Sequence, residues 1–389
     1  MIDRDLTPRL RTLAKQFPAI TLTGPRQSGK STLCRAVFPQ HTYANLELPD
    51  VRSFAKDDPR AFLGQFKAGA ILDEIQRVPD LISYVQGLID GAPTPGRWIL
   101  TGSQNLAVLE SVSQSLAGRT AVLHLPPLTR REVLRFPEHP GSLDETIISG
   151  GYPRIFDQRL DPSEWLASYI ATYIERDVRM ITNVHDLTAF QRFVELSAGR
   201  TSQLLNFLQI ASDCGITQPT AKAWLSVLEA CFITFRLPSF AGSLRKRLVK
   251  MPKLHFMDTG LACRLLGIRT VDQLRNHPLR GPLFETWVVS EIRKYRMNAG
   301  LMGGMFHYRS QNGVEGDLIL ENFDGLSLVE IKASQTASSS LFDSVRRVGE
   351  AFPPERSRKA FVVYGGEMEQ ERSDVSLVPW ESLHRYVWE

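Results

Sequence analysis

Consecutive residues near the N-terminus combine the residue types and the spacing of a phosphate-binding loop: Gly24, Pro25, Arg26, Gln27, Ser28, Gly29, Lys30 and Ser31, followed by Thr32. The two glycines let the backbone pass close to a polyphosphate, so that amides of the loop and of the next helix point at the anion. Lys30 places a positive charge on the β- and γ-phosphates, and the Ser31 hydroxyl is a ligand for Mg²⁺. The pattern predicts a loop that binds ATP together with Mg²⁺.

Two adjacent carboxylates follow about forty residues later, directly after the apolar run 70–72. At this distance from a phosphate-binding loop, the first carboxylate holds Mg²⁺ through water and the second activates the attacking water. Asp73 is therefore predicted as a metal ligand beside Ser31, and Glu74 as the catalytic base, with Lys30 as the second catalytic group. The alternative, a strand that merely ends in solvated acids, is disfavoured by the spacing.

The elements that must position these residues are short apolar runs separated by helical patterns. Residues 19–23, 70–72 and 97–102 predict buried strands. Strands that alternate with helices favour a parallel sheet, which binds its ligands at the carboxyl ends of the strands. The third run ends in Ser103, Gln104 and Asn105, so these polar side chains are expected to face the γ-phosphate.

The order of a phosphate-loop strand, an Asp-Glu strand and a polar-tipped strand resembles AAA+ ATPases. This resemblance implies that Ser103, Gln104 or Asn105 senses the γ-phosphate, without deciding which one. It also implies an arginine finger offered to a neighbouring subunit, for which Arg119 is the candidate, and a second phosphate sensor, Arg154. The reading of each arginine as an ordinary surface residue stays open. A finger acting between subunits implies a ring-shaped homo-oligomer, by resemblance a hexamer.

The middle of the chain contains a candidate DNA-binding element. Residues 204–231 have the spacing of two helices joined by a short turn, and the strand-like run 232–237 after them suggests a winged helix. Gln218, Thr220 and Lys222 are expected on the exposed face of the second helix. In the run 245–253, five of nine residues are basic and are expected to contact phosphates, namely Arg245, Lys246, Arg247, Lys250 and Lys253. A solvated wing or a protein-docking surface is the alternative.

A second polar constellation lies in the last hundred or so residues. Glu285 opens a helical pattern, Asp317 begins a predicted strand, and Glu330 and Lys332 share one face of the next strand. Two carboxylates on neighbouring strands can hold Mg²⁺ while the lysine stabilises developing negative charge. The arrangement resembles the PD-(D/E)xK fold of restriction-endonuclease-like nucleases, which would make these four residues a nuclease site. An edge strand with outward charges is the alternative.

Composition limits the class of protein. Of 389 residues, 43% are hydrophobic and 23% are charged, and the formal net charge is +4, which excludes a disordered, collagenous or coiled-coil chain. The four cysteines are widely separated, so neither a zinc ribbon nor a disulfide framework is expected. No run is apolar enough for a membrane span or a signal peptide. We therefore expect a cytoplasmic protein without a membrane partner.

The whole chain resembles a widespread prokaryotic family of AAA-type ATPases with a C-terminal domain of unknown function. We therefore expect an α/β protein: an AAA+-like P-loop NTPase core with a parallel sheet (1–155), a helical and winged-helix region (156–278) and a small restriction-endonuclease-like α/β domain (279–389). The first functional hypothesis is a Mg²⁺-dependent ATPase that drives DNA binding or remodelling, as a helicase, translocase or junction-processing motor. The alternatives are an ATP-gated Mg²⁺-dependent nuclease and an NTP-dependent switch acting on protein partners.

Overall fold

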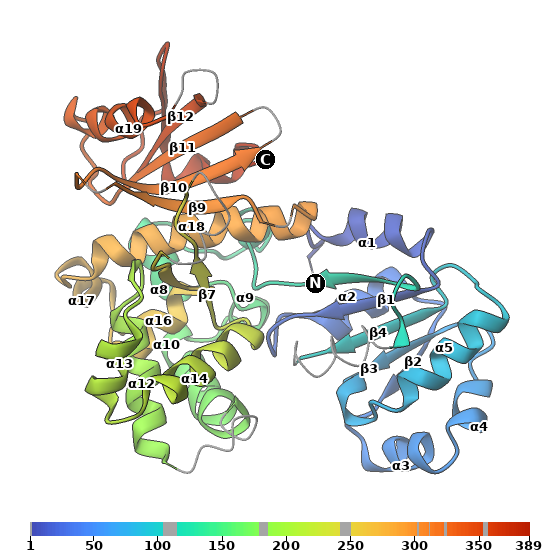
Figure 1. Ribbon diagram of the computed structural model, residues 1–389. Coiled ribbons are helices and arrows are strands. Elements are labelled where there is room, and N and C mark those ends of the chain that lie inside the picture. The colour runs from blue at the N-terminus through green and yellow to red at the C-terminus, as the bar shows by residue number, and fades with distance from the viewer. Residues whose placement is uncertain are drawn as a thin grey trace. The chain divides into compact units, whose positions relative to one another are not determined.

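The computed structural model describes residues 2–103, 115–178, 186–241, 250–301, 303–310, 312–322, 325–352 and 357–389. They form two compact units, whose elements are labelled in Figure 1. The first unit comprises Met1–Leu128, Ala230–Phe232 and Met297–Gly300, and the second comprises Thr129–Glu229, Ile233–Arg296 and Leu301–Glu389.

The first unit is built on a parallel five-stranded sheet with the order β2-β3-β4-β1-β5, as the strand and helix pattern predicts. Its strands are β1 (Ala19–Thr23), β2 (Thr42–Asn45), β3 (Ala70–Asp73), β4 (Trp98–Gly102) and β5 (Thr120–His124). The helices are α1 (Thr7–Ala14), α2 (Lys30–Val37), α3 (Pro49–Asp57), α4 (Pro59–Gly64) and α5 (Leu81–Gly91).

Both faces of this sheet are buried, which explains why its strands are almost continuously apolar in sequence. Leu72 and Leu100 pack into one hydrophobic cluster, whereas their neighbours Ile71 and Ile99 pack into another. Successive side chains of a strand point to opposite faces, so the two clusters lie on the two sides of the sheet. The sheet is thereby a rigid support for the loops at the carboxyl ends of its strands.

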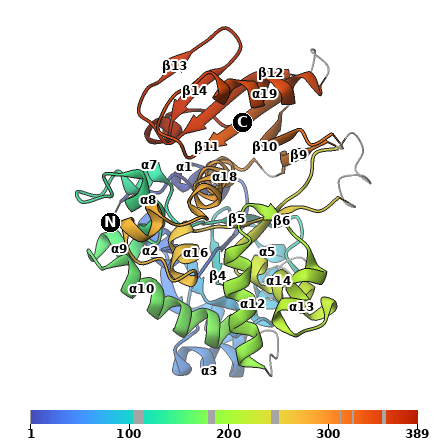
Figure 2. The ribbon, with the colours of Figure 1, turned by 90° about the vertical axis from the view of Figure 1, so that its left-hand side faces the viewer.

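The second unit begins with helices and continues with a small antiparallel sheet. The helices are α7 (Arg130–Val133), α8 (Leu143–Ser149), α9 (Pro153–Asp157), α10 (Pro162–Tyr169), a π-helical segment (Ile170–Val178) and α12 (Leu187–Gly199). Then follow β6 (Gln203–Leu204), α13 (Phe207–Cys214), α14 (Gln218–Ala230), β7 (Thr234–Leu237) and β8 (Lys253–Phe256). The three strands pair antiparallel in the order β6-β8-β7, and α12, α13 and α14 are grouped in Figure 2.

The predicted pair of helices joined by a short turn is present as α13 and α14. Asn206 begins α13, because its side chain accepts hydrogen bonds from the backbone amides of Leu208 and Gln209. Gly215 ends the helix in the left-handed conformation, at φ +71°. Thr217 then caps α14 by accepting a hydrogen bond from the Thr220 amide at 3.3 Å.

The remainder of the second unit is a long helix and a mixed six-stranded sheet. After α16 (Thr259–Leu265) and α17 (Val271–Arg275) come α18 (Arg280–Ala299), β9 (Met305–Arg309), β10 (Glu315–Asn322), β11 (Gly325–Lys332), α19 (Ser340–Glu350), β12 (Ser357–Tyr364), β13 (Gln370–Glu371) and β14 (Ser376–Pro379). The strand order is β13-β14-β12-β11-β10-β9, and α19 packs on β10, β11 and β12 (Figure 2). Among the described residues, no helix has both the length and the apolar character of a membrane span.

Candidate functional site

The loop between β1 and α2 has a backbone that requires glycine. Gly24 has φ +154°, and a Cβ atom at this position would lie 2.3 Å from the carbonyl oxygen of Leu125. Gly29 precedes the first residue of α2 and has φ +91°, a conformation that other residues rarely adopt. The loop therefore leads from a buried strand to the N-terminus of a helix, where backbone amides are free to bind an anion.

The Lys30 side chain is buried, with 5% of its surface exposed, and its hydrogen-bond partners are backbone carbonyls. Its ammonium group donates hydrogen bonds to the carbonyl oxygens of Gly24 at 3.0 Å and Pro25 at 2.8 Å. Burial lowers the pKa of Lys30, and the negative charges of Glu74 and Asp73 partly oppose this effect. The hydrogen bonds of Lys30 thus go to the loop itself, and its ammonium group can turn to an incoming phosphate.

Asp73, at the end of β3, is fixed by three hydroxyl groups. Its carboxylate accepts hydrogen bonds from Ser31 Oγ at 2.7 Å, from the Tyr43 hydroxyl at 2.5 Å and from Thr101 Oγ1. The structure therefore brings Ser31 and Asp73 together, as the sequence predicts. Their oxygen atoms fit Mg²⁺, which prefers hard oxygen ligands.

Tyr43 and Thr101 are site residues that sequence reasoning missed. Thr101 is a polar residue in the otherwise apolar strand β4, which is a detectable signal in retrospect. Tyr43 lies on the short strand β2, and nothing in its neighbourhood in sequence connects it to Asp73. Burial, together with the hydrogen bond to Asp73, raises the pKa of Tyr43, so its hydroxyl remains a donor.

Glu74 adopts a left-handed backbone conformation, with φ +57° and ψ +46°. Such a backbone is uncommon for glutamate and occurs preferentially at functional sites. The Glu74 carboxylate accepts hydrogen bonds from Ser103 Oγ at 3.0 Å and from Gln76 Nε2. Ser103 therefore lies beside the candidate base, whereas the two other sensor candidates, Gln104 and Asn105, lie outside the described residues.

The predicted arginines have other partners in this structure. Arg119 pairs with Asp90, with Nε and Oδ1 separated by 2.5 Å. Arg154 belongs to the second unit, is exposed, and donates a hydrogen bond from Nε to Gln158 at 3.2 Å. Arg26 lies 3.8 Å from Glu47. Their roles toward a nucleotide stay predictions.

In the second unit, α14 presents several of the predicted DNA-contacting residues. Lys222 is exposed, and its Nζ atom lies 5.7 Å from the centre of the Phe207 ring. Gln218 is half-buried, and Thr220 shares a hydrogen bond of 2.8 Å with Thr217. Lys250 is exposed. Three further residues of the basic run, Arg245, Lys246 and Arg247, lie outside the described residues.

Lys253 corrects the expectation that the whole basic run faces a nucleic acid. Only 12% of its side-chain surface is exposed, and its ammonium group donates a hydrogen bond to Glu285 Oε1 at 2.7 Å. A second carboxylate oxygen, Asp317 Oδ1, lies 3.7 Å away. In this conformation Lys253 is not available to a phosphate backbone, because it is buried among acidic groups.

The four predicted nuclease-site residues do come together, and Lys253 joins them. Glu330 pairs with Lys332 at 2.6 Å, and Asp317 Oδ2 accepts a hydrogen bond from the Ile331 amide at 2.9 Å. Burial, followed by the negative charge of Asp317, raises the pKa of both Glu285 and Glu330 to about 7. We refer to these five groups, Lys253, Glu285, Asp317, Glu330 and Lys332, as the lysine-bridged cluster.

The lysine-bridged cluster does not fit a metal ion as it stands. Within the described part of the chain, no three Asp, Glu, His or Cys side chains are arranged to hold one. Each lysine already pairs with a carboxylate of the predicted nuclease site, and Glu330 is one of the two predicted metal ligands. The residue types of the predicted site are therefore present, but their charges are compensated within the protein.

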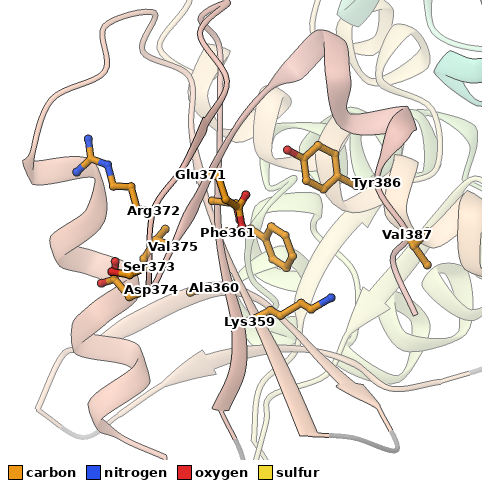
Figure 3. Close-up of a pocket in the computed structure, with 11 residues that line it drawn as sticks. Lys359, Ala360, Phe361, Glu371, Arg372, Ser373, Asp374, Val375, Tyr386 and Val387 are labelled. Atoms are coloured by element: carbon orange, nitrogen blue, oxygen red, sulfur yellow. The ribbon is translucent and has the colours of Figure 1, made fainter.

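A surface pocket of about 290 Å³ lies beside strands β12, β13 and β14 of the C-terminal sheet (Figure 3). It is lined by residues of β12, of the β13–β14 connection and of the C-terminal segment, among them Lys359, Phe361 and Tyr386. The Tyr386 hydroxyl donates a hydrogen bond to Glu369 at 2.6 Å. No motif in the sequence predicts this pocket.

Three family models match successive parts of the chain. They are an AAA domain at residues 16–134, a domain of unknown function (DUF8612) at 141–272 and a domain of unknown function (DUF4143) at 280–383. Relatives include the "Uncharacterized protein Mb2031c" of Mycobacterium bovis and the "Uncharacterized protein Rv2008c" of Mycobacterium tuberculosis. Each is 30% identical over 388 residues, which cover 98% of this chain and 84% of the relative.

Similar solved structures include the Walker-type ATPase PABY2304 of Pyrococcus abyssi, with 15% identity and a TM-score of 0.45. The match covers 68% of this chain and 96% of that protein. A single-substitution variant of RuvB from Thermotoga maritima is 17% identical with a TM-score of 0.33, and the match covers 61% of this chain and 90% of RuvB. Both TM-scores lie below 0.5, so the assignment of the N-terminal part rests on the AAA domain match and on the site geometry.

Proposed function

The chain belongs to the family of the uncharacterized mycobacterial proteins Mb2031c and Rv2008c and contains an AAA domain. From this premise we propose that it is a Mg²⁺-dependent ATPase that couples ATP hydrolysis to DNA binding or remodelling. The observation that carries the ATPase proposal is the bonding of two residues, Lys30 after β1 and Asp73 at the end of β3. The buried Lys30 donates its hydrogen bonds to loop carbonyls, while Asp73 accepts a hydrogen bond from Ser31, the next residue along the chain from Lys30. Such a site holds a polyphosphate and a hard cation together.

Each residue has a distinct task in the proposed hydrolysis. Lys30 would exchange its carbonyl partners for phosphate oxygens, and Ser31 and Asp73 would hold Mg²⁺. When bound, Mg²⁺ would supply charge compensation for the phosphate oxygens. Glu74 accepts the proton of the attacking water. Ser103 and Gln76 hold the Glu74 carboxylate in place until the nucleotide arrives.

The DNA part of the proposal rests on the order of elements in the second unit. A helix, a strand, two helices and two further strands, α12-β6-α13-α14-β7-β8, follow one another as in a winged helix. Thr220 and Lys222 lie on α14, the second helix of the helix-turn-helix pair, where groove contacts are made in such proteins. A helicase, translocase or junction-processing motor would use this element to hold the duplex or branched DNA that the ATPase moves. Binding of a protein partner at the same element is the competing proposal.

Assembly into a ring, with a hexamer as the preferred size, follows from the proposed role of Arg119. Its side chain is partly exposed and lies next to the edge strand β5, at the border of the sheet. To reach the nucleotide of a neighbouring subunit, Arg119 would leave Asp90, an exposed ion pair of low energetic value. Arg154 is the second arginine proposed to contact the γ-phosphate.

ATPase rates measured with no DNA and with duplex, single-stranded or branched DNA test the coupling. We expect at least one DNA form to raise the rate severalfold, and Lys222→Glu combined with Lys250→Glu to abolish the stimulation. Lys56→Glu is the matched control, because Lys56 is an exposed lysine of the first unit. A rate that no DNA form changes would exclude DNA coupling and favour the switch acting on protein partners.

A further inference from the structure

We propose that Lys253 is the resident cation of the lysine-bridged cluster and takes the position that a divalent metal ion would hold between Glu285 and Asp317. The wild-type cluster would then bind no divalent metal ion, and metal-dependent chemistry at this place would require Lys253 to leave. This inference concerns the second unit alone and is independent of the proposed ATPase site.

The position of the Lys253 ammonium group supports this assignment. It lies 2.7 Å from one oxygen of Glu285 and 3.7 Å from one oxygen of Asp317, so it faces two carboxylates from different elements, α18 and β10. Both belong to the nuclease site that the resemblance implies, and Asp317 is one of its two predicted metal ligands. A cation already occupies the space between them, and it belongs to the protein.

The charges of the cluster lead to the same conclusion. Three carboxylates face two ammonium groups, and the three carboxylates and Lys253 are at most 15% exposed. Adding a divalent cation would place excess positive charge in a poorly solvated position, which is unfavourable. Replacing Lys253 with a neutral side chain would leave two negative charges uncompensated, and these are the charges that one divalent ion balances.

The surrounding backbone holds Lys253 and its partners in place. β8 is the central strand of the β6-β8-β7 sheet, and Lys253 is paired with Leu204 on one side and Leu237 on the other. The Ile331 amide fixes Asp317 Oδ2, and the Ser202 side chain forms a hydrogen bond with Glu285. Lys253 can therefore leave the carboxylates only by changing its own side-chain conformation or by a shift of β8.

The test is a titration of the nucleotide-free full chain with Mn²⁺. Binding is measured from the electron paramagnetic resonance signal of free Mn²⁺. We expect Lys253→Met to gain one Mn²⁺ site, at least about tenfold tighter than anything in the wild type. Adding Glu285→Gln to this variant should remove the gained site. Lys253→Arg, which keeps the cation, and Lys250→Met, which removes an exposed lysine of the same segment, should both bind Mn²⁺ like the wild type.

Two outcomes would overturn the proposal. One is equal Mn²⁺ binding by folded Lys253→Met and by the wild type, whether both bind or neither binds. The other is a wild-type site tighter than about 1 mM that Glu285→Gln abolishes, and this measurement does not depend on the folding of Lys253→Met. Thermal unfolding followed by circular dichroism establishes that each variant is folded. Neither outcome changes the ATPase proposal, which is tested separately with Lys30 variants.

Discussion

The nucleotide-binding loop and the lysine-bridged cluster both place lysines near carboxylates, but the lysines bond to different kinds of partner. Lys30 donates its hydrogen bonds to backbone carbonyls, while Asp73 is bound by hydroxyl groups. In the cluster, Lys253 pairs with Glu285 and Lys332 pairs with Glu330. The first arrangement bonds the lysine and the carboxylate to neutral groups, whereas the second pairs each lysine directly with a carboxylate.

This difference indicates which of the two regions takes an ionic ligand. Burial lowers the pKa of Lys30 and so disfavours its charged form, and a bound phosphate would favour that form. A buried pair with good geometry gains nothing from a further ion. The same residue types therefore predict a ligand site in the first unit and an internally compensated cluster in the second.

The largest expected effect comes from removing the lysine of the phosphate-binding loop. Lys30→Ala should abolish measurable ATP hydrolysis, because the charge on the β- and γ-phosphates is lost. The rate is measured by phosphate release at saturating Mg²⁺-ATP, with Lys67→Ala, which changes an exposed lysine of the same unit, as the control. Full activity of Lys30→Ala would show that the nucleotide site has been misplaced.

Glu74→Gln should separate binding from hydrolysis. The glutamine keeps the size and the polar contacts to Ser103 but cannot accept a proton, so we expect a loss of about 10²–10⁴ in rate. Nucleotide affinity, measured by fluorescence of a labelled ATP analogue, should change little. Loss of affinity equal to the loss of rate would assign Glu74 a role in binding rather than in water activation.

A smaller effect is expected at Tyr43, whose hydroxyl orients Asp73. Tyr43→Phe keeps the ring against Arg35, which lies 5.1 Å from the ring centre, but removes the hydrogen bond at 2.5 Å. We expect the Mg²⁺ concentration for half-maximal nucleotide binding to rise by about tenfold, as for other partners of metal ligands. Tyr84→Phe on α5 should leave it unchanged. An unaltered Mg²⁺ requirement in Tyr43→Phe would limit Tyr43 to a packing role.

The smallest expected effect concerns the pH dependence of stability in the cluster. Burial, with the charge of Asp317, raises the pKa of Glu330 from its ordinary value of 4.5 to about 7. Between these values the folded state binds more protons than the unfolded state, so the free energy of unfolding falls as the pH rises.

Glu330→Gln removes this titration. Between pH 5 and pH 8 its free energy of unfolding should therefore fall less than that of the wild type, by on the order of 1 kcal/mol. Urea unfolding at several pH values measures the difference, with exposed Glu195→Gln as the control. Parallel curves for the wild type and Glu330→Gln would mean that Glu330 keeps an ordinary pKa.

Local patterns made the first unit predictable from sequence. The phosphate-binding loop and the strand that ends in Asp73 are contiguous segments, and their apolar runs correspond to buried strands β1 and β3. Tyr43 and Thr101 escaped prediction because their contact with Asp73 depends on the order of strands in the sheet. That order is set by tertiary packing, which no single segment encodes.

The prediction for Lys253 failed for a different reason, because its neighbours in sequence indicated the wrong environment. In sequence it belongs to a basic run, and basic runs are usually solvated or bound to phosphates. In the structure it faces Glu285, which follows it by 32 residues, and Asp317 from a third element. Residue type and neighbours in sequence indicate a charge, but only the fold determines where that charge is compensated.

The most direct test of the contrast between the two regions is the number of Mn²⁺ ions that the wild-type chain binds tightly with and without ATP. We expect one ion per chain, present only with ATP and abolished by Asp73→Asn but not by Glu285→Gln. A tight Mn²⁺ ion that binds without ATP and disappears in Glu285→Gln would overturn this contrast, because the lysine-bridged cluster would then be an open metal site.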